Sequence, residues 1–291
     1  MRRAVGSRQR QRTSALVVIV RTFGELMITF GIVVLLFVVY TLYVTDIVAA
    51  KQQGDVNDQL EQSWAGPATQ QSVTPNKPPK HPVKPQQGAG FSRIYLPSFG
   101  TDFKFVIVEG VGQDELAVGP GHYPDTALPG QPGNVGIAGH RIGKGAPFND
   151  LDKLNSCDAI VLETETDFFV YRVMPMPDEV ANWDTVKQRD PRCARVPSLR
   201  QQNQPQGGPY NRTVGRRIVT PDRGDAVAPV PYRPDNPLPK AQQASLVTLT
   251  TCHPEYGNSE RMIIHGALVN QVPKQQAGSY RALLGLIGEQ V

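Results

Sequence analysis

The feature that most constrains this chain is a run of twenty residues, 26–45, that contains no charged side chain. It reads LMITFGIVVLLFVVYTLYVT. At ~1.5 Å per residue, a helix of this length spans ~30 Å, which is the thickness of the hydrocarbon core of a bilayer. The run is too long for the apolar part of a signal peptide, and only the weak cleavage candidate IVAAK follows it. We therefore predict a transmembrane helix over residues 22–45 in preference to a buried core helix.

The charges around this run predict its orientation. Six arginines precede residue 22, and the first acidic residue is Glu25. A basic arm of this kind can bind nucleic acid, but the apolar run that follows it argues against a nucleic-acid partner. Arginine before the run and Asp46 after it place the N-terminus in the cytoplasm by the positive-inside rule. We expect a single-pass protein of the cell membrane, with a cytoplasmic tail over residues 1–21 and a large extracytoplasmic part.

Residues 46–90 have the composition of a linker. Pro and Gln are scattered through WAGPATQQSVTPNKPPKHPVKPQQGAG, apolar periodicity is almost absent, and Trp64 is the single aromatic residue. Such a segment cannot bury enough apolar surface to offset the entropy lost on ordering it. We expect a disordered linker that holds the following domain away from the bilayer.

The segment that follows, from Phe91 to Val272, is rich in short β-branched and aromatic runs that Gly, Pro, Asn and Asp interrupt. The runs are SRIYLPSF, FKFVIVEGV, GNVGIAGH, AIVLETE, DFFVYRVMPM, SLVTLTT and RMIIHGALV. This pattern predicts an all-β sandwich or closed barrel. ETETDF predicts a tight turn that makes an antiparallel hairpin of residues 160–164 and 168–174. Residues 146–154 are the one helix-like segment within it.

Two further segments depart from this pattern. Residues 185–214 are polar and rich in Gln, Pro and Gly, and they are too many for an ordinary connection, which predicts a flexible surface insertion. The chain returns to a strand pattern around 218–219. The tail, residues 273–291, either forms a short amphipathic helix over 280–287 or is a frayed end.

The three cysteines, Cys157, Cys193 and Cys252, are an odd number, so at least one is unpaired within the chain. Three cysteines are too few for a fold that depends on a disulfide scaffold. A bridge between Cys157 and Cys193 is possible, although no local pattern supports it. No Cys/His cluster has zinc spacing and no acidic cluster stands out, so we expect no metal, no calcium site and no cofactor.

Cys252 and Arg261 lie at corresponding ends of two predicted strands, 246–252 and 261–269. If these strands pair as an antiparallel hairpin, the two residues stand roughly opposite each other. A free thiol has a pKa of ~8.5 and needs positive charge nearby to become a useful thiolate. A guanidinium can supply that charge, or it can donate hydrogen bonds to an oxyanion. A buried structural cysteine beside a surface arginine fits these residues equally well.

A thiol nucleophile also needs a proton carrier, and the histidines are the candidates. His140 follows the apolar run VGIAG directly, which places its ring on a rim and not in a core. His122 lies in the turn-rich GPGHYP and could be a solvated loop residue. His253 follows Cys252, so its side chain would point to the other face of a strand. His265 alternates with its neighbours within the last strand. Position therefore favours His140.

The motif TLTTC, followed closely by an arginine on the next strand, resembles the signature of the sortases, the membrane-anchored cysteine transpeptidases of Gram-positive bacteria. GPGHYPDTALPGQPGNVGIAGHR and GAPFNDLDKL resemble the histidine-bearing region of the class E sortases of actinobacteria. The resemblance covers residues 91–272 in order and separation. It implies an eight-stranded β-barrel with short helices, preceded by the transmembrane helix and the linker. The insertion at 185–214 is longer than the family pattern.

The resemblance also implies roles for individual residues. Cys252 would be the nucleophile that forms a thioester with the threonine of a C-terminal sorting signal, of LAxTG or LPxTG type. His140 would be the general acid and base, and Arg261 would hold the substrate backbone or the oxyanion. Thr251 would help shape the oxyanion site, and Tyr123 matches a tyrosine implicated in the LAxTG preference. The acceptor would be an amine of a peptidoglycan precursor, lipid II.

Three alternatives stay open at this point. A pilin-polymerising sortase would use a lysine of another protein as the acceptor. A non-catalytic, extracytoplasmic β-barrel could bind a wall component or partner, in which case these residues would be incidental. A cysteine hydrolase would use water, but papain-like enzymes carry their cysteine on a long helix, and none is predicted over 248–256.

Overall fold

The computed structural model describes residues 15–40, 45–65, 84–187, 189–199, 207–235 and 238–289. The chain divides into two compact units, Met1–Thr45 and Asp46–Val291. The first fourteen residues of the predicted cytoplasmic tail and residues 66–83 of the predicted linker lie outside the described part.

The described part of the first unit is the helix α1, Ala15–Val39. Among the described residues it is the one helix that is long and apolar enough to cross a membrane. It begins earlier than the span predicted over 22–45, because its first turns include Arg21, which pairs with Glu25 one turn later. At the other end α1 stops at Val39, and Thr45 is already the first residue of the next helix.

That next helix, α2 (Thr45–Trp64), shows that the predicted disorder was wrong for these residues. Within the second unit, the helix packs on the barrel through one stripe of side chains, and Ala49 and Leu60 are each 3% exposed. Two further residues of the stripe, Gln53 and Asn57, are polar and hydrogen-bond to the barrel. Because half of the stripe is polar, a search for apolar periodicity does not detect the helix.

The described part of the second unit contains nine strands in one sheet. Their order is β6-β5-β1-β2-β3-β4-β8-β9-β7, and a further pairing of β6 with β9 closes eight of them into a barrel. The predicted eight-stranded barrel is therefore confirmed, with β7 added on the edge of β9. The strands are β1 (Gly90–Tyr95), β2 (Lys104–Glu109), β3 (Gly121–His122), β4 (Gly133–Ala138), β5 (Ala159–Glu163), β6 (Asp167–Val173), β7 (Arg216–Val219), β8 (Ser245–His253) and β9 (Glu260–Pro273).

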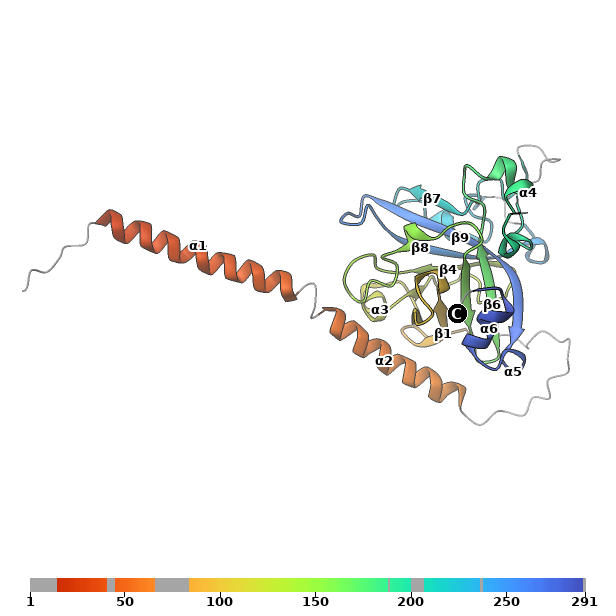
Figure 1. The fold of residues 1–291 in the computed structure, drawn as a ribbon, viewed down its shortest axis with the longest axis horizontal. Coiled ribbons are helices and arrows are strands. Elements are labelled where there is room, and N and C mark those ends of the chain that lie inside the picture. Colours follow the sequence, from red (N-terminus) through yellow and green to blue (C-terminus); the bar gives the residue numbers. More distant parts are fainter. Residues whose placement is uncertain are drawn as a thin grey trace, which may run out of the picture. The chain divides into compact units, whose positions relative to one another are not determined.

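The long strand β9 organises the closure. It pairs with β8 along most of its length, with β7 near its start, and with β6 toward its end. Figure 1 shows β9 as the long blue strand that lies between β8 and β7 and continues down to α5. The predicted hairpin is confirmed as β5 and β6, which pair antiparallel.

The barrel interior is filled by aliphatic and aromatic side chains from almost every strand, among them Ile94, Ile107, Ile137, Leu162, Tyr171 and Leu249. A second apolar cluster covers the outside of β5 and β6. There Val161 and Val170 pack with Leu283 of the C-terminal segment. Residues 280–286 therefore form a docked helix, not a frayed end.

The helices of this unit after α2 are short, as expected. They are α3 (Gln113–Val118), α4 (Trp183–Val186), α5 (Lys274–Ala277) and α6 (Tyr280–Leu286), with 3-10 turns at Pro97–Phe99, Leu151–Lys153, Val180–Asn182, Pro191–Cys193, Gly224–Val227 and Lys240–Gln242. The helix predicted over 146–154 is reduced to the turn Leu151–Lys153. Ala146 has a left-handed φ of 38°, which is incompatible with a right-handed helix at this residue.

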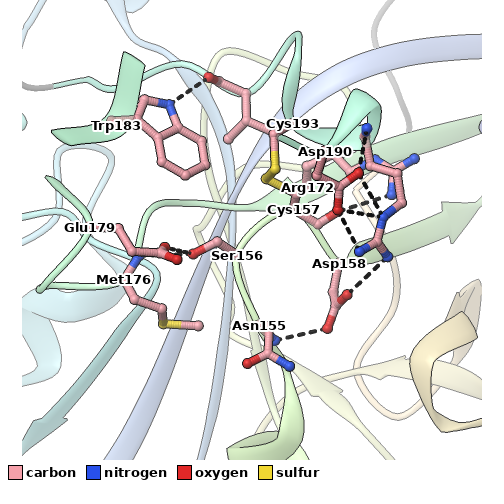
Figure 2. The surroundings of a disulfide bond; sticks show 12 residues. Asn155, Ser156, Cys157, Asp158, Arg172, Met176, Glu179, Trp183, Asp190 and Cys193 are labelled. Atoms are coloured by element: carbon pink, nitrogen blue, oxygen red, sulfur yellow. Dashed lines mark hydrogen bonds and ion pairs between the residues drawn. A yellow bond between two sulfur atoms is a disulfide. The ribbon is translucent and has the colours of Figure 1, made fainter. Parts of the chain in front are cut away.

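The segment between β6 and β7, residues 174–215, is called the arm here. The predicted flexible insertion falls within it, and residues 188 and 200–206 of that insertion lie outside the described part. Cys193 of the arm forms a disulfide with Cys157, which precedes β5, and both cysteines are buried. Figure 2 shows Trp183 on one side of this bond and the charged Asp158, Arg172 and Asp190 on the other. The first half of the arm is thus anchored to the barrel.

Candidate active site

The two strands that carry the predicted nucleophile and cation are direct neighbours. In the ladder between β8 and β9, Cys252 pairs with Arg261. Cys252 is a free thiol and is half-buried. The Arg261 guanidinium donates through Nη1 to the carbonyl oxygens of Asn258 and Glu260, both at 2.9 Å. A guanidinium has five N–H donors, so these two hydrogen bonds leave Arg261 able to donate another to an oxygen near the thiol.

His140 lies at the same end of the barrel, two residues beyond the end of β4, the strand next to β8. β4 runs parallel to β8 with Ala138 opposite Thr250, so His140 and Cys252 each follow this pair by two residues. Gly139 N donates to Thr250 O at 3.0 Å, which extends the pairing beyond the end of β4. A Cβ at Gly139 would come within 2.5 Å of the Phe148 ring, so only glycine fits directly before the histidine.

The environment of the His140 ring favours the neutral imidazole. Burial, and to a smaller extent the charge of Lys144, lower the pKa of His140 below its ordinary value. Its Nε2 atom is buried and has no hydrogen-bond partner among the described residues. A buried ring nitrogen without a partner is costly in a purely structural histidine. A neutral imidazole can accept the proton of a thiol that comes within hydrogen-bond reach.

Thr251 and Tyr123 both contact this part of the barrel. The Thr251 hydroxyl is buried and donates to Gly139 O at 2.8 Å, so it ties β8 to the backbone just before His140. The Tyr123 hydroxyl lies 3.0 Å from the hydroxyl oxygen of Thr250. A Cβ at Gly136 would come within 3.0 Å of the Tyr123 ring, so glycine makes room for this tyrosine.

A second pair of side chains links the two segments that carry His140 and Cys252, and the sequence analysis missed one of them. Arg141 Nη1 lies 3.0 Å from His253 Nδ1, and Arg141 Nη2 lies 3.3 Å from Asp152. Arginine only donates, so His253 Nδ1 accepts and its proton sits on Nε2, which is 4.0 Å from Glu260. Arg141 directly follows His140 in GHR, and His253 directly follows Cys252 in TCH. This adjacency to the candidate catalytic residues was the signal that the sequence offered.

His122 is not a solvated loop residue. It is 1% exposed in β3, and its Nδ1 lies 2.6 Å from Glu109 of β2. Its Nε2 contacts the hydroxyl of Thr126 at 2.8 Å and the carbonyl of Ala127 at 3.1 Å. The carboxylate partner comes from another strand, so the turn-rich local sequence did not reveal the burial. The pair holds the segment that carries Tyr123.

His265 is fully buried in β9 and serves the fold. Burial, assisted by the charge of Arg217, lowers the pKa of His265 to about 3. The Thr248 hydroxyl donates to Asn134 at 2.7 Å, so it must accept from His265 Nδ1, at 2.8 Å. His265 Nε2 then accepts from the Tyr232 hydroxyl at 3.0 Å. The network fixes the segment before β8. Among the described residues, no group of three or more His, Cys, Asp or Glu could hold a metal ion.

Comparisons with known proteins identify the family to which the barrel belongs. The family model for the sortase domain matches residues 94–269. Sortase SrtE1 of Streptomyces coelicolor is 28% identical over 273 residues, which cover 91% of this chain and 62% of that protein. This chain therefore spans less than two thirds of the length of SrtE1. Sortase SrtE2 of the same organism is 30% identical over 186 residues, covering 62% of this chain and 71% of SrtE2.

A solved structure shares the fold as well. The SrtF sortase from Corynebacterium diphtheriae is 41% identical, with a TM-score of 0.56, over 68% of this chain and 93% of its own. The family match covers more than half of the chain and contains β4, β8 and the start of β9, where His140, Cys252 and Arg261 lie. The chain belongs to the sortase family, and its curated relatives SrtE1 and SrtE2 support the resemblance to class E.

Proposed function

We propose that this protein is a membrane-anchored cysteine transpeptidase. It cleaves a C-terminal sorting signal of LAxTG or LPxTG type between Thr and Gly, and it transfers the new acyl group to an amine of a peptidoglycan precursor, lipid II. The observation that carries the proposal is the register of three neighbouring strands. It brings Cys252 opposite Arg261, and both His140 and Cys252 follow the Ala138–Thr250 pair by two residues.

In the first half-reaction, neutral His140 takes the proton of the Cys252 thiol, and the thiolate attacks the threonine carbonyl carbon. Arg261 donates to the oxyanion that forms or to the adjacent substrate backbone. The carbon–nitrogen bond then breaks, and imidazolium at His140 gives its proton to the departing glycine amine. The product is a thioester on Cys252.

In the second half-reaction, the incoming amine attacks the thioester carbonyl and loses a proton to His140. The thiolate leaves, and a new amide bond joins the threonine to the acceptor. Tyr123 and Thr251 are proposed to contact the signal and to shape the oxyanion site. Thr251 would shape the oxyanion site through the backbone of Gly139, because its hydroxyl donates its proton to Gly139 O.

The proposed location follows from α1 and the arginines before it. The helix would span the cell membrane with the N-terminus in the cytoplasm, and the barrel would face the cell wall. In that compartment a disulfide such as Cys157–Cys193 persists, which agrees with an extracytoplasmic barrel.

The test incubates the full chain in detergent micelles with an LAxTG peptide, with and without diglycine, beside the Cys252→Ala variant. A transpeptidated product that disappears in the variant supports the proposal. Cleavage that added amine does not change would indicate a hydrolase, and a lysine peptide preferred over diglycine would indicate a pilin-polymerising enzyme. No cleavage of either LAxTG or LPxTG peptides would favour a non-catalytic wall-binding barrel.

A further inference from the structure

The loop after His140 has an unusual backbone. Four consecutive residues, Gly143, Lys144, Gly145 and Ala146, have left-handed φ values of 63°, 54°, 75° and 38°. Lys144 and Ala146 carry a Cβ, which makes this conformation unfavourable for them. Such a run persists only where surrounding contacts hold it. Residues in unfavourable backbone conformations of this kind cluster at functional sites.

Contacts within the loop account for part of this support. Ala146 N donates to Gly143 O at 2.9 Å, and Phe148 N donates to His140 O at 3.0 Å. The amide of Gly145, at the centre of the run, is bound by a residue from elsewhere in the chain. It donates to Asp46 Oδ1 at 3.0 Å, across a separation of 99 residues.

Asp46 belongs to the first turn of α2, and this turn covers the loop. A Cβ built on Gly145 would lie 3.7 Å from the Cβ of Ala49, which is itself 3% exposed. The Asp46 carboxylate and the Ala49 methyl group thus both lie next to Gly145 of the loop. A carboxylate accepting from a backbone N–H makes a stronger bond than a neutral acceptor does.

The helix is itself fixed to the barrel along its length, so it can act as a support. Gln53 makes three hydrogen bonds to backbone groups, of 2.8 Å and 3.1 Å to Val106 and of 3.0 Å to Val118. Arg93 binds Asn57 at 2.9 Å and Glu61 at 2.7 Å. At the far end, the Trp64 ring contacts Arg93 and Lys274, whose charged groups lie 4.7 Å and 3.9 Å from the ring centre.

We propose that α2 is a positioning element of the active site, and that Asp46 is the residue through which it acts. By binding Gly145 N, Asp46 holds the left-handed loop and thereby the orientation of His140. This inference rests on the proposed function of His140 as the proton carrier. Asp46 follows shortly after α1, which ends at Val39, so the loop that orients His140 is supported by the chain segment next to the candidate membrane anchor.

The test compares Asp46→Ala and Asp46→Asn in the full chain in detergent micelles, with Asp58→Ala as the matched control. Asp58 is an exposed aspartate of the same helix. In Asp46→Ala, kcat should fall about tenfold with KM unchanged, less than the ~10²-fold that a displacement of 1 Å can cost. Asparagine keeps an acceptor oxygen, so Asp46→Asn should recover most of kcat. Alkylation of Cys252 by iodoacetamide should be slower in Asp46→Ala, because a displaced His140 takes the thiol proton less readily, and should proceed at the wild-type rate in Asp58→Ala.

Amide hydrogen exchange supplies a readout that needs no turnover. Exchange in the segment 141–147 should be faster in Asp46→Ala than in the wild type, while exchange in β8 and β9 stays unchanged. Wild-type exchange and kcat in Asp46→Ala would overturn the proposal, as would faster exchange with unchanged kcat, or equal losses in the Ala and Asn variants. If the wild type itself transfers no peptide, the proposed function fails, and the exchange comparison still decides whether Asp46 holds the loop.

Discussion

Two regions meet at the candidate active site, and they are held in different ways. Cys252 and Arg261 lie nine positions apart in sequence on adjacent strands, and the ladder between β8 and β9 sets their separation. His140 lies beyond the end of β4 in an irregular loop, and side chains from distant segments hold that loop. They are Thr251, His253, which contacts Arg141 of the loop, and Asp46 of α2.

The difference separates two kinds of catalytic geometry. A ladder fixes backbone positions through many hydrogen bonds, so a single side-chain substitution cannot move Cys252 away from Arg261. A loop with left-handed residues depends on a few contacts, so one substitution can move His140. Substitutions at Cys252 and Arg261 should therefore remove chemistry, whereas substitutions around His140 should change its position or its pKa.

The largest effect is expected in the first region. Arg261→Ala should lower kcat by about 10²–10³-fold, the loss found when a donor to an oxyanion is removed. Arg261→Lys keeps the charge but loses the fork of donors, so it should recover only part of the rate. Steady-state kinetics with an LAxTG peptide and diglycine measure both variants. A fall in Arg261→Ala of less than about threefold would contradict a role for Arg261 in the transition state.

A smaller effect is expected from the pair that links the two regions. His253→Ala removes the acceptor of Arg141 Nη1 and should lower kcat by about tenfold, because the segment after His140 loses a contact to the segment after Cys252. His253→Gln retains an acceptor oxygen and is the matched control.

Arg141→Ala should add little to His253→Ala if the two residues act through each other, and the double-mutant cycle measures this coupling. Fully additive losses in the double variant would show that the two residues act separately. Thermal unfolding of each variant, followed by circular dichroism, identifies any loss that comes from instability.

The smallest effect concerns the pKa of His140. Burial and the Lys144 charge lower this pKa, so the imidazole stays neutral to a lower pH than an exposed histidine does. If the neutral ring takes the thiol proton, kcat/KM should fall only as the pH drops through this lowered pKa, on the acidic side of ~6.5. Lys144→Gln removes the smaller of the two causes of the lowered pKa. It should therefore move the acidic limb of the kcat/KM profile to higher pH by less than about one unit.

The pH dependence of kcat/KM between pH 4 and 8 tests this, with Lys187→Gln of the arm, a half-buried lysine paired with Asp184, providing a charge-matched control. A limb that Lys144→Gln leaves in place or moves to lower pH would contradict the assignment of the limb to His140.

The comparison also explains what the sequence could predict. The strand pairs and the Cys252–Arg261 register follow from alternation and from residues close together in the chain, and these are the features that short-range patterns report. The hairpin of β5 and β6 was predictable for the same reason. The eight-stranded barrel was implied by the resemblance to the sortases, because the strand pattern alone left a sandwich open as well.

The features that were missed depend on partners from distant segments. α2 is held by Gln53 and Asn57, polar residues whose partners are backbone and side-chain groups of β1 and β2 and the end of α3. His122 is buried because Glu109 of another strand meets it. The disulfide required the arm to fold back over Cys157, which no local pattern indicates.

The most direct test of the central claim is intact-mass spectrometry of the full chain mixed with an LAxTG peptide without added amine. The account predicts an adduct with the mass of the peptide up to its threonine, attached to Cys252 as a thioester that diglycine releases. Slower formation is expected in His140→Ala, and no adduct in Cys252→Ala. Peptide cleavage with no adduct on Cys252, or cleavage that persists in Cys252→Ala, would contradict the account.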